Sequence, residues 1–162
     1  MKNQIDLLLK YMDMNFNSIP INKATTAISL QCEMQHATFD YFLVLRESGT
    51  PPLIQFSIPI PVDVPENKQA DVLLFMSLMN LHRQEGPGNW IFDPAKAQLI
   101  FIYNWHCDVQ SESFEQTFRY LFVKFIADAD DSSEGLLSLL QGTLHPEEAV
   151  LLFANRNKAC LN

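Results

Sequence analysis

The four histidines and three cysteines are the side chains of this sequence that could bind a metal ion. His106 and Cys107 are neighbours at the end of an expected strand, where consecutive side chains point to opposite faces, so this pair could not readily share an ion. The spacings C-x-x-C and H-E-x-x-H are absent. We interpret these residues as surface histidines and small buried thiols, and we predict neither a metal nor another cofactor. The residues concerned are His36, His82, His106, His145, Cys32 and Cys107.

Paired carboxylates could offer a second kind of chemistry. Asp40 with Glu47, or Asp128 with Asp130, could perform acid–base catalysis if one member of the pair were buried beside a cleft. Each of these residues lies in an expected turn or at an expected helix end, where it should be exposed to water. Glycine-rich phosphate loops and the G-x-S-x-G motif are also absent. The sequence therefore predicts a protein that is not an enzyme.

Composition and charge exclude further classes of protein. The chain has 162 residues, of which 48% are hydrophobic and 19% charged, as is typical of one globular domain with a packed core. Its net charge of −8 disfavours nucleic acid and anionic membrane surfaces as partners. The cysteines are odd in number and widely spaced, which argues against a secreted disulfide framework. No stretch has the pattern of a signal peptide or a membrane span, so we expect a cytoplasmic protein.

Acidic residues concentrate between His106 and Gly135. They have two interpretations, the solvated end of a helix or a docking patch for a basic partner. The residues are Asp108, Glu112, Glu115, Asp128, Asp130, Asp131 and Glu134.

The first half of the chain predicts a helix and then three strands. Residues 2–14 have the spacing of an amphipathic helix, and residues 26–35 alternate with a period of two. Residues 39–46 carry apolar side chains on both faces, which indicates a central strand. Residues 53–60 alternate again, but Pro59 and Pro61 have no N–H to donate to a ladder. This third strand is therefore predicted either to lie at an edge of the sheet or to stop pairing at these prolines.

The second half predicts a helix, a hairpin and more helices. The helix over 65–85 should end at the glycines of 86–88, and its middle is apolar nearly all the way round. Residues 89–92 and 98–105 predict a hairpin, in which Trp90 and Trp105 are expected to pack against neighbours and not to stack on a ligand. Ser113 to Gln116 has the spacing of a capping box before a helix with an aromatic stripe, and His145 opens a short final helix.

These elements predict an α+β fold in which an antiparallel sheet packs with helices. The sheet consists of a three-stranded meander plus a hairpin, and the order is α-β-β-β-α-β-β-α plus a helical tail. Residues 1–142 are expected to form one domain, with residues 143–162 as the short helical tail.

The segments at the corners of this order carry a resemblance. They are the opening helix, the meander end Ile58-Pro59-Ile60-Pro61-Val62, the helix with Leu78-Met79-Asn80, the glycine break, the hairpin and the aromatic helix after Ser113. Over residues 2–130 the chain resembles the bacterial YbjN-like proteins and, more distantly, the type III secretion chaperones. The resemblance implies a compact, commonly dimeric domain that acts as a chaperone, adaptor or regulator and has no chemistry of its own.

We therefore expect a protein-binding module that forms a homodimer. The predicted dimer interface is Val72, Leu74, Phe75, Met76, Leu78 and Met79, and the alternative is that the terminal helix buries these residues within a monomer. A partner is predicted to pair with the expected edge strand at Ile54, Gln55, Phe56, Ser57 and Ile58, unless the prolines only protect that edge. The alternative function is a sensory or regulatory domain that holds a small apolar ligand between helix and sheet.

Overall fold

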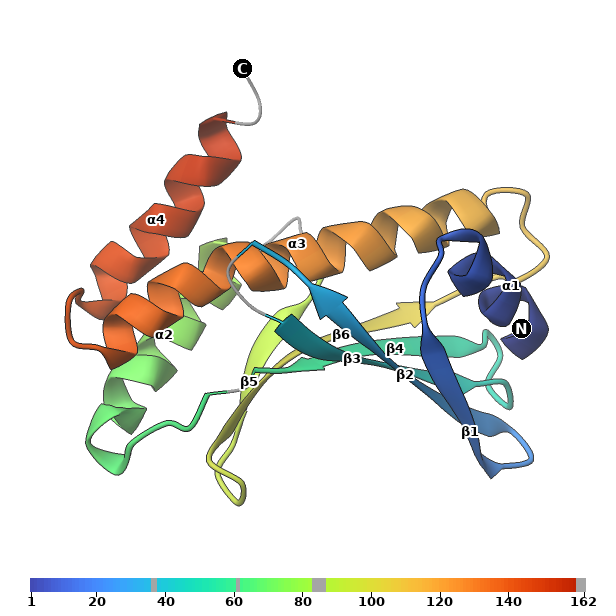
Figure 1. The fold of residues 1–162 in the computed structure, drawn as a ribbon, viewed down its shortest axis with the longest axis horizontal. Helices are drawn as coiled ribbons and strands as arrows, with labels where there is room; N and C mark the ends of the chain where they lie inside the picture. The colour runs from blue at the N-terminus through green and yellow to red at the C-terminus, as the bar shows by residue number, and fades with distance from the viewer. Residues whose placement is uncertain (36–37, 61, 83–86, 160–162) are drawn as a thin grey trace.

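The structure is a computed structural model that describes residues 1–35, 38–60, 62–82 and 87–159, with side chains described as far as residue 153. These residues form four α-helices and one six-stranded antiparallel sheet, so the predicted α+β class is confirmed (Figure 1). The helices are α1 (Lys2–Tyr11), α2 (Gln69–His82), α3 (Phe114–Leu140) and α4 (Pro146–Ala159), with a 3-10 turn at Glu66–Lys68 before α2. The strands are β1 (Phe16–Asn22), β2 (Thr25–Glu33), β3 (Thr38–Arg46), β4 (Leu53–Pro59), β5 (Asn89–Asp93) and β6 (Gln98–His106).

Strand β1 makes the meander four-stranded, where the sequence predicted three strands. It pairs with β2 from Phe16 to Asn22, with an irregularity after Pro20. Ile19 and Ile21 of β1 are 60% and 59% exposed. Because the apolar side chains of this edge strand face water, β1 does not show the alternation that identifies a half-buried strand.

The hairpin and the meander form a single sheet with the strand order β1-β2-β3-β4-β6-β5. The β5–β6 hairpin is confirmed, and its turn is stabilised by the Ala95 N–H, which donates to Asp93 Oδ1 at 3.0 Å. Strand β4 pairs with β3 on one side and with β6 on the other. The two predicted units therefore share one hydrophobic core.

Aromatic side chains fill the space between α3 and the sheet. The apolar stripe of α3 places Phe122 against Tyr41 of β3, with ring centroids 4.9 Å apart, and stacks Phe125 on Phe101 of β6 at 4.5 Å. Phe56 of β4 lies within 6.4 Å of both Tyr41 and Phe125, measured between ring centroids. All five rings are almost fully buried. The aromatic stripe predicted from the sequence is thus the core-facing side of α3.

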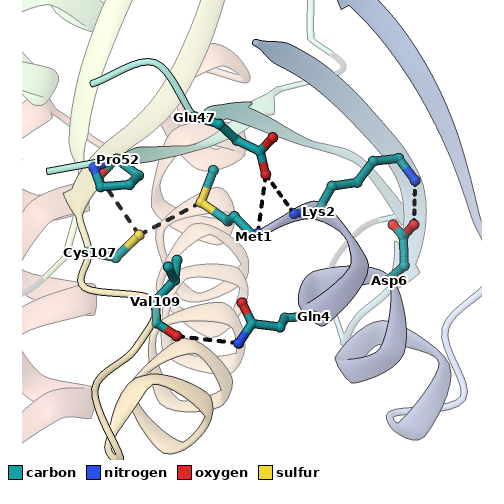
Figure 2. A network of polar contacts seen from close by, with 8 residues as sticks. All are labelled: Met1, Lys2, Gln4, Asp6, Glu47, Pro52, Cys107 and Val109. Atoms are coloured by element: carbon teal, nitrogen blue, oxygen red, sulfur yellow. Dashed lines mark hydrogen bonds and ion pairs between the residues drawn. The ribbon is translucent and has the colours of Figure 1, made fainter. Parts of the chain in front are cut away.

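Helix α1 is held at the other end of the sheet by the polar contacts in Figure 2. Glu47, just after β3, accepts the backbone N–H of Lys2 at 2.9 Å and lies 3.2 Å from the Met1 amino group. Gln4 donates to the backbone oxygen of Val109 at 3.3 Å. The Cys107 thiol lies 3.9 Å from the Met1 sulfur. These contacts connect α1 to the loop after β3 and to the segment between β6 and α3.

Helix α4 closes the opposite end by packing on α2 and α3 (Figure 1). Ala149, Val150 and Phe153 of α4 are buried. A Cβ at Gly135 of α3 would lie 2.6 Å from the backbone oxygen of Ala149, so the two helices approach more closely there than a side chain would allow. The tail is helical as predicted, and its buried residues belong to the same core as the rest of the chain.

Helix α3 corrects the interpretation of the acidic segment for Asp128 and Asp130, whereas Asp108, Glu112 and Glu115 are exposed before and in its first turn. It runs without a break for 27 residues, about 40 Å at 1.5 Å per residue. Asp128 and Asp130 are only 1% and 4% exposed, so they lie neither at a solvated helix end nor on a docking patch. The reason is that α2 and α4 pack around this part of α3. Lys124 forms an ion pair with Asp128 one turn away.

Helix starts and ends also differ from the sequence prediction. The Ser113 side chain makes no capping bond to α3 and instead lies 3.0 Å from the Ser111 hydroxyl, so the capping box is wrong. The expected helix over 65–85 begins with the 3-10 turn and is described as α2 only to His82. The expected turn at residues 36–37 and the first residue of the glycine break lie outside the described residues, while Gly88 of that break has a positive φ of 107°.

Candidate protein-docking surfaces

Strand β4 is not an edge strand, and this prediction is wrong. Both of its sides are paired, from Leu53↔Arg46 with β3 and from Leu53↔His106 with β6. Of the five predicted contact residues, Ile54, Phe56 and Ile58 are fully buried beneath the helices, and Gln55 and Ser57 point to the other face. Pro59 ends the strand, so the alternative stated for the prolines, that pairing stops there, is correct. A partner cannot add a strand to β4, because its ladder groups already have partners within the sheet.

The true edges of the sheet are β1 and β5. Asn80 of α2 covers β5: its Oδ1 accepts the Trp90 N–H at 2.8 Å, and its Nδ2 donates to the Trp90 oxygen at 3.0 Å. The Asn80 amide thus occupies the place that the backbone of another strand would take. Edge β1 contains Pro20, which has no N–H to offer.

Helix α2 buries most of its predicted dimer interface inside the chain. Val72, Phe75, Met76 and Met79 are between 0% and 6% exposed, facing β5, α3 and α4. Burial within the monomer, the alternative stated for these residues, is correct for these four. Of the predicted set, only Leu74 is exposed, at 44%, while Leu78 is half-buried.

The outward side of α2 is nevertheless apolar. Leu73, Leu74 and Leu81 are 47%, 44% and 63% exposed. Ser77 shares this side and bonds to the Leu73 oxygen of its own helix at 2.8 Å. No charged residue occurs from Val72 to Leu81. Leu73 and Leu81 were absent from the predicted interface, although counting positions around the helix from the buried residues would have found them.

A second uncovered surface of the domain is one face of the sheet, which we call the open face. In Figure 1, α1 and α3 lie over one face of the sheet and none of the drawn helices lies over the other. Two central rows cross all or most of the strands of the open face. One row is Ile19, Ala27, Val44, Gln55 and Asn104. The other is Asn17, Ser29, Phe42, Ser57, Ile102 and Asn89.

The open face also contains a hollow next to β1. Its volume is about 720 Å³, and its lining includes Asn17, Ser29, Gln31, Asp40 and Phe42. The Gln31 amide donates to the Asp40 carboxylate at 3.0 Å. A smaller hollow of about 310 Å³ lies between α1 and α3, beside Leu7, Tyr11 and Arg119.

Comparisons with protein-family models, with curated proteins and with solved structures find no match to this chain. Its docking surfaces must therefore be interpreted from their own geometry and chemistry.

The histidines and cysteines were the candidate metal ligands in the sequence. Within the described residues, no group of three or more His, Cys, Asp or Glu side chains could hold a metal ion. His82, His106 and His145 are exposed, as expected, and His36 lies outside the described residues. Burial raises the pKa of the Cys32 thiol to about 11 and also raises the pKa of Cys107. A thiol with a raised pKa is a weak nucleophile at neutral pH.

The remaining candidates for chemistry are two carboxylates and two tryptophans. Asp40 and Glu47 are exposed, as predicted, and lie at opposite ends of β3. Trp90 is buried against Phe101, and Trp105 stacks on Phe114 with ring centroids 5.4 Å apart, which confirms the expected packing. None of the helices in the described part of the chain is long and apolar enough to cross a bilayer.

Proposed function

We propose that this chain is a non-catalytic protein-binding domain of chaperone, adaptor or regulator type, similar to the YbjN-like proteins and the secretion chaperones. The observation that carries the proposal is the outward side of α2, where Leu73, Leu74 and Leu81 are exposed within a stretch, Val72 to Leu81, that contains no charged residue. A partner protein with an apolar helix docks on this side. The order of helices and strands supports the comparison with those families, apart from the additional strand β1.

The energetics of the leucines favour a docked state. Fully burying a leucine side chain is worth roughly 1.5–3 kcal/mol, so covering the exposed halves of three leucines contributes about 2–4 kcal/mol. The four predicted interface residues that the chain itself buries hold α2 in a fixed orientation, and so fix the position of its outward side. A rigid apolar helix face loses little conformational entropy when a partner binds it.

The partner is expected to differ from the chain in charge. With a net charge of −8, this protein disfavours strongly acidic partners, and an apolar helix flanked by basic residues fits both the leucines and the overall charge.

The experiment is affinity capture from native extracts with wild-type protein and with Leu81→Asp. Leu7→Asp on α1 is the matched control, because Leu7 is 67% exposed and Leu81 is 63% exposed. We expect one reproducible partner with wild type and with Leu7→Asp, and a loss of about tenfold or more with Leu81→Asp, since a buried carboxylate is costly. If Leu81→Asp and Leu74→Asp both capture the partner as well as wild type does, α2 is not the docking surface.

The alternative of a small apolar ligand between helix and sheet has no specific observation in its favour. The rings of Tyr41, Phe56, Phe101 and Phe125 occupy that space, and the hollows described above lie on the outside of the domain. Native mass spectrometry of the purified protein would detect such a ligand.

A further inference from the structure

The open face of the sheet is uncharged at its centre and charged at its ends. Neither central row contains an acidic or basic residue, although the chain has 19 acidic and 11 basic residues. Along β3, Arg46 stands at one end of the open face and Asp40 at the other, and both are exposed. Glu33 of β2 also lies at the Asp40 end, where it is paired with Thr38.

We propose that a second copy of this chain docks on the open face, so that two sheets pack face to face. The two-fold axis that relates the copies lies between the two sheets, parallel to their planes and perpendicular to the strands. This inference goes beyond the binding of a partner protein at α2 and uses a different surface. The homodimer expected from the sequence needs such a surface, because four of its six predicted interface residues are buried inside the chain.

The position of the axis follows from β3. Alternate residues of a strand share a face, so Asp40, Phe42, Val44 and Arg46 all point to the open side. The midpoint between Asp40 and Arg46 lies between Phe42 and Val44, and each charge is about 10 Å from it at ~3.3 Å per residue. A two-fold axis through this midpoint sets Phe42 opposite the Val44 of the other copy. The same axis sets each Arg46 opposite an Asp40.

Shape supports the same arrangement. The 720 Å³ hollow lies at the Asp40 end of the open face, beside β1, β2 and β3. The axis brings the long Arg46 side chain of the second copy to this hollow, where Asp40 and Gln31 offer oxygen acceptors. A guanidinium group forms charge-assisted hydrogen bonds with a carboxylate in such a setting. Each copy thus supplies a projecting cation and a hollow with an anion.

A two-fold axis parallel to the strands fits the charges less well. With that axis, the end of one sheet that carries Arg46 and His106 would face the same end of the second copy. The two ends that carry Asp40 would also face each other. Like charges would then face each other, which opposes association. The central rows are also the part of an acidic chain where two copies meet without repulsion between their carboxylates.

The flat area of the open face is of the same order as the area that a dimer interface buries. Six strands about 4.8 Å apart and about 20 Å long span roughly 500 Å² before side-chain relief is counted. A stable interface takes about 800 Å² of accessible surface from each partner, which is within a factor of two. Packed sheets stand about 10 Å apart, a distance that Phe42, Val44 and Ile102 can fill from both sides.

The test uses charge reversals measured by sedimentation velocity. Wild type is expected to be a dimer at tens of micromolar. Arg46→Glu and Asp40→Arg should each raise the dimer dissociation constant about tenfold or more, since each variant creates two repulsive contacts in its own dimer. An equimolar mixture of the two variants should form a heterodimer, because both contacts then join opposite charges. The matched control, Lys10→Glu on α1, should dimerise like wild type.

Three results would overturn the proposal. One is a wild-type protein that stays monomeric at tens of micromolar. Another is a dimer that Arg46→Glu and Asp40→Arg leave intact but Leu81→Asp dissociates, which would assign self-association to α2. The third is two variants that fail to pair when mixed, although circular dichroism shows both to be folded. If Leu81→Asp loses partner capture but dimerises like wild type, partner binding at α2 and dimerisation at the open face use different surfaces, as proposed.

Discussion

Asn80 allows a quantitative test of how the sheet is closed at β5. Asn80→Ala removes the two hydrogen bonds at 2.8 and 3.0 Å that satisfy the backbone of Trp90, a residue that is 2% exposed. A buried backbone group left without a partner costs about 1–3 kcal/mol, and because these two bonds are only partly buried we expect about 1–2 kcal/mol for each, or roughly 2–4 kcal/mol in the free energy of unfolding. For a chain of this size, about 2–4 °C of melting temperature corresponds to each kcal/mol. The melting temperature of Asn80→Ala, followed by circular dichroism, should therefore lie roughly 5–15 °C below that of wild type.

Two further variants make the Asn80 test specific. Asn22→Ala removes one exposed hydrogen bond, from the Ala24 N–H at 2.9 Å, and should cost no more than about 1 kcal/mol. Asn80→Asp keeps an acceptor for the Trp90 N–H but sets a carboxylate oxygen against the Trp90 carbonyl. Its deficit should shrink as the pH falls and the new carboxyl group becomes a donor. If Asn80→Ala melts within about 2 °C of wild type, the argument that Asn80 replaces a neighbouring strand is wrong.

Three other perturbations have equally definite outcomes. Gly135→Ala places a Cβ 2.6 Å from a backbone oxygen of α4, so it should cost about 1–3 kcal/mol and speed amide hydrogen exchange in α4; unchanged exchange would contradict the close helix contact. At neutral pH the buried thiols of Cys32, whose pKa is raised to about 11, and Cys107 should resist alkylation until the protein unfolds, with labelled sites identified by mass spectrometry. The backbone N–H of Lys2 is the main cause that lowers the pKa of Glu47 below its ordinary 4.5. The ionised Glu47 carboxylate therefore stabilises the folded protein above pH 4.5, and this contribution is lost as the pH falls through the lower pKa of the folded state. Glu47→Gln should flatten this acid limb when the free energy of unfolding is measured against pH.

The sequence predicted those elements whose periodicity is visible in apolar side chains. The stripe of α3 and the alternation of β2 and β4 belong to this group, because each buries one side against the core. Strand β1 was missed because Ile19 and Ile21 face water. Pro59 was misleading, because a proline at the end of an internal strand looks the same in a sequence as one at an edge.

Docking surfaces were harder to predict than elements. The sequence shows that α2 is apolar all round, but only the positions of α3, α4 and β5 decide that Val72 and Phe75 are buried while Leu81 is exposed. The open face depends on the register of six strands, which brings residues from Ile19 to Asn104 into one row. Such long-range pairing leaves no local pattern in the chain.

The two tryptophans give the domain a pair of optical reporters at separate places. Trp90 is buried between Phe75 and Phe101, and its indole N–H has no hydrogen-bond partner among the described residues. Its fluorescence should therefore be shifted to the blue and respond to any displacement of α2 from β5. Trp105 is half-buried on Phe114, so its emission should lie further to the red and follow the junction of β6 with α3. Replacing one tryptophan at a time by phenylalanine would let each end of the molecule be observed by itself in solution.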